Sequence, residues 1–148
     1  SPRELVNLLV NIVAKGGNLA LNVSPQPDGR IPVDPMDSLR GLGHWLKTHG
    51  EAIYGTRVCK PYQLSNLAFT QTKDAVYAIR LYPAAQESVE SRIFLPYSGK
   101  ISNVSMLGSD EKVTFENSEG GITVKVPDGY RQGSAPIAIV FKLQKADC

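Results

Sequence analysis

The chain contains 148 residues with a mass of 16.1 kDa, which suits one ordinary domain or a small domain joined to part of another. This length excludes a complete α/β barrel, which needs about 250 residues. The formal net charge is only +2 and the basic residues are scattered, so we expect no nucleic-acid partner. No apolar run approaches the roughly 20 residues of a membrane span, and we expect no membrane partner.

Residues 2–15 are predicted to form a helix. Ser1 is a favourable N-cap, Pro2 suits the first helical position, and Glu4 completes a capping box. Glycines at 16 and 17 provide the stop signal. Apolar residues recur at helical spacing and need neighbours to cover them: Leu5, Leu8, Leu9, Ile12 and Val13.

A strand is predicted at residues 18–23, where polar and apolar residues alternate. Residues 24–32 contain three prolines and an Asp-Gly pair, which predict an ordered loop. Asp34 and Pro35 then start a second helix that ends at His49 and Gly50. Its apolar face contains Leu39, Leu42, Trp45 and Leu46.

From about Ser65 the hydrophobic period changes from 3.6 to 2, which predicts strands. About seven are expected, joined by turns such as Lys73-Asp74: residues 64–72, 75–82, 90–96, 101–107, 113–116, 121–127 and 136–143. This spacing is typical of an antiparallel β-sandwich, which we assign to residues 58–148. Cys59 and Cys148 are too few for a disulfide framework, and we favour two unpaired thiols.

Residues 1–57 cannot form a domain alone, because they supply one strand between two helices. That arrangement is a unit of a parallel sheet, whose strands pair along both edges and are buried on both faces. We therefore interpret this segment as the end of a larger α/β domain. Its apolar residues must be covered by the rest of that domain, by a second copy of the chain, or by folding back on the sandwich.

Two sequence runs carry a family resemblance: GGNLALNVSPQPDG at residues 16–29 and LGHWLKTHGEAIYGTR at residues 42–57. They resemble the end of the catalytic (β/α)8 barrel in family 29 glycoside hydrolases, the α-L-fucosidases. Residues 69–78 also resemble the first strands of the β-sandwich in that family. Ala20, where the family has a bulky Leu, and Val58-Cys59, where it often has Pro-Trp, are departures.

The resemblance implies the C-terminal part of a retaining exo-α-L-fucosidase that acts on fucosylated glycans. Retaining chemistry needs two carboxyl groups about 5–5.5 Å apart, and in the family both lie upstream of this segment. We therefore expect no catalytic residue and no cofactor here, and an inactive chain. The family is commonly secreted or periplasmic in bacteria and lysosomal in animals; no signal-peptide pattern occurs in this segment.

The ionisable residues have simpler explanations than catalysis. Turn and cap positions account for three acidic residues near the predicted barrel strand, Asp28, Asp34 and Asp37. Glu51 is expected to form a salt bridge, with Arg57 six residues later, or a loop hydrogen bond that fixes the junction between the domains.

No metal site is predicted from the two histidines. His44 and His49 are five residues apart rather than four, and no carboxylate motif accompanies them. The helix dipole explains a histidine at the position of His49, near a helix C-terminus.

Asn22 is the candidate substrate-adjacent residue, because barrel active sites lie at the C-terminal ends of the strands. The alternative is that Asn22 and Ser24 hold their own proline-rich loop, and the pattern favours this alternative.

A carbohydrate-binding sandwich is the second functional hypothesis. It would use tyrosines from the strand region to stack on a sugar: Tyr77, Tyr82, Tyr97 and Tyr130. Half-buried packing between strands is the more ordinary role for such residues.

Overall fold

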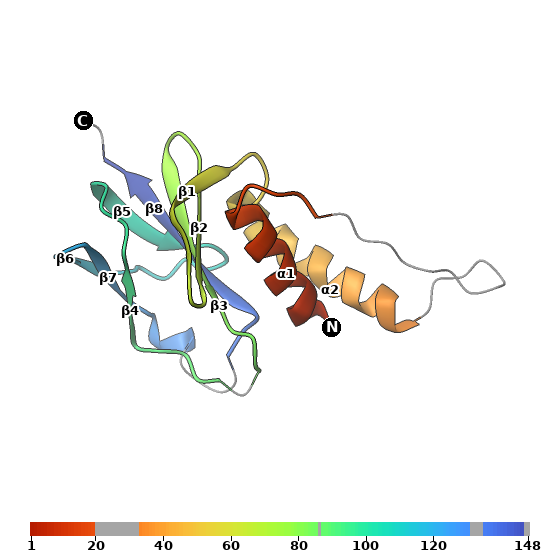
Figure 1. Ribbon diagram of the computed structural model, residues 1–148. Helices are drawn as coiled ribbons and strands as arrows, with labels where there is room; N and C mark the ends of the chain where they lie inside the picture. The colour runs from red at the N-terminus through yellow and green to blue at the C-terminus, as the bar shows by residue number, and fades with distance from the viewer. Residues whose placement is uncertain (20–32, 86, 131–134, 147–148) are drawn as a thin grey trace.

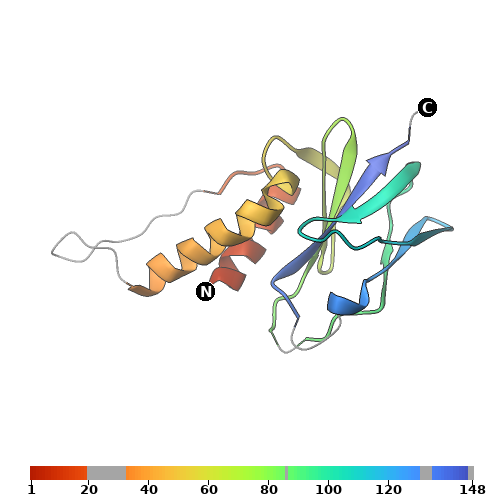
Figure 2. The ribbon, with the colours of Figure 1, turned by 180° about the vertical axis from the view of Figure 1, so that it is seen from behind.

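A computed structural model describes residues 1–19, 33–85, 87–130 and 135–146 of the chain (Figure 1). Two helices, α1 (Pro2–Ala14) and α2 (Val33–His49), lie side by side against one face of the strand region. The view from behind shows the same separation of a helical layer from the strands (Figure 2). No helix in this described part has the length and apolar character needed to cross a membrane.

Helix α1 follows the local signals in the sequence, whereas α2 begins at Val33, one residue before the predicted cap position Asp34. The Ser1 hydroxyl accepts a hydrogen bond from the Glu4 backbone N–H at 3.3 Å, as expected for an N-cap, and Pro2 opens α1. Gly16 follows the helix with φ +86°, a conformation that glycine adopts without steric cost. A short 3-10 turn, η1 (Gly50–Ala52), continues from α2 toward the strands.

The strands form two antiparallel sheets, which confirms the predicted sandwich. In the larger sheet the order is β1 (Arg57–Leu64), β2 (Leu67–Gln71), β3 (Ala75–Leu81), β8 (Ala138–Lys145) and β5 (Ile101–Met106). In the smaller sheet it is β4 (Arg92–Leu95), β7 (Gly121–Lys125) and β6 (Phe115–Ser118). The short turn η2 (Asp128–Tyr130) follows β7.

The described residues contain eight strands rather than about seven, because the strand predicted at residues 64–72 is divided and β1 was not expected. Ser65, at φ 53°, and Asn66 turn the chain between β1 and β2. Pro61 hides β1 in the sequence, since proline rarely occurs in a paired strand. β1 tolerates it as an edge strand with a register shift between Val58 and Gln63.

The larger sheet is buried on both faces and so separates two hydrophobic cores. One core lies between the sheets and includes Phe69, Val104 and Phe141. The other lies between the helices and the larger sheet and includes Val10, Trp45 and Val140. β3 and β8 contribute alternate residues to both cores, which explains their nearly continuous apolar sequences.

Helix α1 packs on the sheet with the side that holds its shorter apolar residues. Val6, Val10 and Ala14 are fully buried, whereas Leu8 is 45% exposed. Leu5, Leu9 and Val13 are only partly buried. α1 has apolar residues on more than one side, and the sheet covers the side with the smaller ones.

The N-terminal helices therefore pack one side on the sandwich, and the outer side of α1 is left uncovered. Arg3 fastens the start of α1 to the chain leading into β8, because its guanidinium donates to the carbonyl oxygens of Pro136 at 3.0 Å and Ala135 at 3.2 Å. At the other end of the helical layer, the buried Thr70 hydroxyl on β2 donates to the Ala52 carbonyl at 2.6 Å.

Candidate functional site

A hollow of about 630 Å³ lies where α1, the start of the predicted barrel strand and the entry to β1 meet. We call it the junction hollow. Leu9 and Val13 line it from α1, Asn18 and Leu19 from the segment after the helix, and residues 53–58 from the other side. The part of the chain that resembles the end of a barrel thus borders the junction hollow, which has both apolar side chains and glycines in its lining.

Several predicted site residues lie outside the described part of the structure. They are Asn22, Ser24, Asp28 and the side chain of Asp34, together with residues 20–23 of the predicted strand. Residues 17–19 form no regular secondary structure. Asp37 lies on the exposed surface of α2, 3.8 Å from Arg40, one helical turn away.

Glu51 fixes the junction between the helices and the sandwich, but its partner is not Arg57. Its Oε2 lies 2.5 Å from the Lys142 ammonium on β8 and accepts the Tyr77 hydroxyl of β3 at 2.7 Å. Arg57 instead donates to the Thr56 carbonyl at 3.2 Å. The expected pair was wrong because the alternation of β3 and β8 directs Tyr77 and Lys142, which are paired across the strands, to the helical side of the sheet.

The electrostatics of this cluster suit an anchor rather than an acid–base pair. Hydrogen bonding to Lys142 and Tyr77 lowers the pKa of Glu51. Burial, and then the neighbouring Glu51 carboxylate, raise the pKa of Tyr77 well above its usual value. Glu51 therefore stays ionised and Tyr77 stays protonated at neutral pH, so the hydrogen bond between them is retained.

The two histidines do not come together. His49 stacks on Trp45 with ring centroids 4.7 Å apart, and its Nδ1 lies 3.0 Å from the Trp45 carbonyl, while His44 is exposed. Burial lowers the pKa of His49. Within the ranges that the structure describes, no three His, Cys, Asp or Glu residues are grouped in a way that could hold a metal ion.

The tyrosines named for sugar stacking are mostly core residues. Tyr77 is 3% exposed and Tyr82 is fully buried, which contradicts a stacking role for both. Tyr97 and Tyr130 pack partly buried against the core between the sheets. The exposed aromatic residues are others, which the strand patterns did not indicate: Tyr54, Tyr62 and Phe94.

Cys59 is buried at 3% exposure, and burial raises the pKa of its thiol, so it is a packing residue rather than a nucleophile. Cys148 lies outside the described residues.

Comparison with known proteins agrees with this architecture. The family description "Alpha-L-fucosidase" matches residues 1–51, and "Alpha-L-fucosidase C-terminal domain" matches residues 61–144. The α-L-fucosidase of Branchiostoma floridae is 36% identical over 132 residues, which cover 84% of this chain and 28% of that protein.

Two crystal structures of Thermotoga maritima α-fucosidase also resemble the chain. The complex with fucose gives a TM-score of 0.77 at 31% identity, and the complex with a mechanism-based inhibitor gives 0.78 at 29%. Each alignment covers 97% of this chain but only 34% of that enzyme.

The class that these matches define is glycoside hydrolase. Because relatives more than 30% identical cover most of its length, the chain belongs to the α-L-fucosidase family, glycoside hydrolase family 29.

Proposed function

We propose that the chain is the C-terminal, non-catalytic part of a retaining exo-α-L-fucosidase that removes terminal α-L-fucose from glycans. Its helices would complete the catalytic barrel, and its sandwich would brace them. The proposal rests mainly on one observation. Two segments of the chain match two different family descriptions, yet their side chains pack together in one hydrophobic core. Residues 1–51 match the catalytic family and residues 61–144 match the C-terminal domain, yet α1 and α2 pack directly on the larger sheet.

The outer side of α1 supports a barrel neighbour. Leu8 is 45% exposed there, and Leu5, Leu9 and Val13 are only partly buried. Leu9 and Val13 also line the junction hollow, which continues this apolar surface toward Leu19. A preceding barrel segment of the same protein would cover these side chains and gain about 25 cal/mol per Å² of apolar surface.

Three described carboxylates have structural partners, which supports a non-catalytic role for them. Glu87 and Glu90 are close in sequence, but Arg80 lies between them, 3.8 Å from Glu87 and 2.9 Å from Glu90. Burial alone would raise the pKa of Glu90, but hydrogen bonds from its own backbone N–H, Arg80 and Tyr82 lower it, whereas a general acid needs a raised pKa. Glu51 is held in the anchor with Lys142.

An assay with an aryl α-L-fucoside tests the non-catalytic part of the proposal. The purified chain should give no turnover above the buffer background, while a full-length family member in the same assay should be active. Enzyme-catalysed release of the aryl group by the chain alone would overturn this part.

A chimera tests the bracing role. In it, this chain replaces the matching segment of the Thermotoga enzyme, and we expect fucosidase activity. Leu8→Asp puts a charge on the outer side of α1, where the barrel would pack, and should reduce that activity. Lys125→Asp changes an exposed residue at the end of β7 and should leave the activity unchanged. A soluble, folded but inactive chimera, or equal effects of the two changes, would contradict the proposal.

The proposal includes the location of the parent protein. We propose that it is secreted or periplasmic if the source is a bacterium and lysosomal if the source is an animal.

A further inference from the structure

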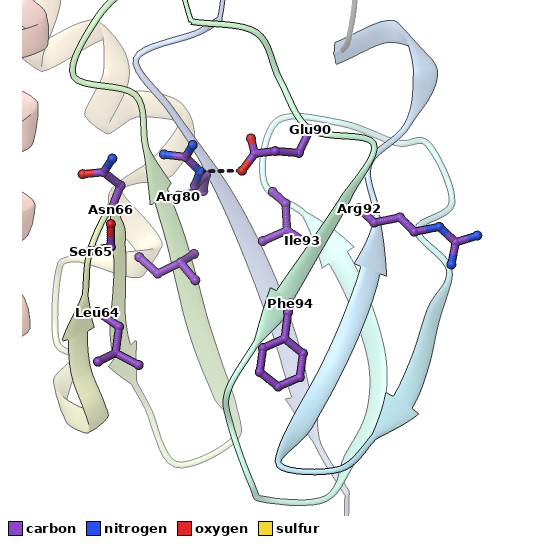
Figure 3. A pocket seen from close by; sticks show the side chains of 9 residues that line it. Leu64, Ser65, Asn66, Arg80, Glu90, Arg92, Ile93 and Phe94 are labelled. Atoms are coloured by element: carbon purple, nitrogen blue, oxygen red, sulfur yellow. Dashed lines mark hydrogen bonds and ion pairs between the residues drawn. The ribbon is translucent and has the colours of Figure 1, made fainter.

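A second hollow, of about 280 Å³, opens between the β1–β2 hairpin and β4 (Figure 3). We call it the hairpin pocket. Leu64 and Asn66 come from the hairpin, Arg80 from β3, and Glu90 and Phe94 from β4 and the segment before it. Its volume is just below the range of about 300–1,000 Å³ found for drug-sized ligands, so one small ring is the size of ligand that suits it.

One end of the hairpin pocket is polar and already fixed in place. Arg80 Nε donates to Glu90 Oε2 at 2.9 Å, and the Tyr82 hydroxyl donates to Glu90 Oε1 at 2.9 Å. The Arg80 guanidinium also lies over the Tyr82 ring, 4.2 Å from its centroid. These contacts hold both charged groups before a ligand arrives, which reduces the entropic cost of binding.

Glu90 remains accessible to a ligand. Its side chain is 40% exposed, although Arg80, beneath it, is only 14% exposed. An ionised carboxylate offers about four acceptor positions, and three donors are in place: Arg80, Tyr82 and its own backbone N–H. One acceptor position is thus left for a ligand hydroxyl, and Asn66 at the hairpin turn also lines the hollow.

The other side of the hairpin pocket is apolar. Phe94 is 45% exposed and Leu64 is 47% exposed, and they come from different sheets. Along β4 the side chains alternate, so Ile93 fills the core at 5% exposure while Phe94 points outward. The core therefore does not require an aromatic residue at position 94, but an aromatic face is a stacking surface for the C–H groups of a sugar ring.

The charge balance disfavours an acidic ligand. Arg80 is neutralised by Glu90 and, at 3.8 Å, by Glu87. Arg92 extends away from Glu90 in Figure 3 and lies 4.0 Å from Glu116 on β6. An acidic or phosphorylated ligand would have to compete with two carboxylates for Arg80.

We propose that the hairpin pocket binds one neutral pyranose unit of a glycan, with its ring stacked on Phe94 and a hydroxyl donating to Glu90. The sandwich would then hold a glycan in addition to bracing a barrel. This role does not depend on the fucosidase activity proposed above, because all of its groups belong to the described strands and their connections.

Nuclear magnetic resonance titration of the ¹⁵N-labelled chain tests the site. L-Fucose, D-galactose and a fucosylated trisaccharide are the ligands, and glycerol is the control for a polyol without a ring. Saturable shifts should be concentrated at Ser65, Asn66 and Phe94, with a Kd on the order of 1 mM for a ligand of this size. The sugar that binds most tightly identifies the pyranose.

Two variants and two matched controls connect any binding to the pocket. Phe94→Ala and Glu90→Gln should each weaken binding by about tenfold. Tyr54→Ala removes an exposed aromatic side chain outside the pocket, and Glu119→Gln removes an exposed carboxylate in the turn after β6, so both should bind like the original chain. The amide spectrum of each variant shows whether it is folded.

Three outcomes would overturn the proposal. They are the absence of saturable shifts with every sugar, equal shifts with glycerol, and binding by the original chain that a folded Phe94→Ala variant retains at full strength.

Discussion

Truncation of Val10 tests whether the helices and the sandwich unfold as one unit. Val10 is fully buried in the core between the helices and the larger sheet. Val10→Ala removes two methyl groups worth about 0.8 kcal/mol each, and the cavity they leave raises the loss to about 2.5 kcal/mol. The higher helix propensity of Ala offsets about 0.5 kcal/mol, so the net destabilisation should be about 2 kcal/mol.

Leu8→Ala is the matched control on the same helix. Leu8 is 45% exposed on the outer side of α1, so its truncation in the isolated chain should change stability by less than about 0.5 kcal/mol. For a chain of this size, the Val10 change corresponds to a fall in Tm of about 4–8 °C.

Thermal and urea unfolding provide the measurement. Trp45, the single tryptophan of the chain, is 5% exposed in the same core, so its fluorescence reports the helical layer, while far-UV circular dichroism reports all secondary structure. The two signals should change together in one transition. Equal effects of Val10→Ala and Leu8→Ala, or a separate early Trp45 transition, would refute the packing of the helices on the sheet.

Two further predictions concern the helix contact and the charged anchor. An added Cβ at Gly41 would overlap the Pro2 ring, so Gly41→Ala should destabilise the chain by about 1–3 kcal/mol. Gly43→Ala meets no atom within 4 Å and should stabilise α2 by about 0.5–1 kcal/mol, so equal changes in Tm for the two variants would contradict the helix contact. Glu51→Gln should cost no more than about 1 kcal/mol at pH 7, because the Glu51 side chain is 44% exposed beside Lys142. The folded-state pKa of Glu51 is lowered, so the difference in unfolding free energy between the original chain and Glu51→Gln should be present above pH 4.5. It should disappear as the pH falls through the folded-state pKa, because Glu51 then loses its charge. If urea titrations at lower pH still show the difference, the contribution of Glu51 to stability does not come from its charge.

Short-range signals predicted most of the elements. The cap at Ser1, the proline at Pro2 and the glycine after the helix placed α1 within one residue of its observed end. Alternation and turn residues located the β2–β3 hairpin around Lys73-Asp74, because these signals act within a few residues. β1 was missed, since Pro61 breaks the pattern and only its edge position makes the proline acceptable.

The candidate sites were less predictable, because their members come from distant positions in the chain. Glu51 meets Lys142 across 91 positions, and no spacing rule relates them. Arg80 and Glu90 are only ten residues apart, but their pairing depends on β3 and β4 lying in different sheets. The division of the chain near residue 57, and any substrate contact by Asn22, stay predictions.

The sequence by itself determined most of the elements, the sandwich and the family resemblance, because capping, alternation and motif runs are local properties of the chain. Only the tertiary structure decided which side of α1 is buried. That helix has apolar side chains on two sides, Val6 and Val10 on one and Leu5 and Leu8 on the other, so periodicity alone gives no choice between them. The choice follows from packing: the larger sheet presents small and apolar residues such as Ala68 and Val140, and the side of α1 with the shorter side chains fits closely against them.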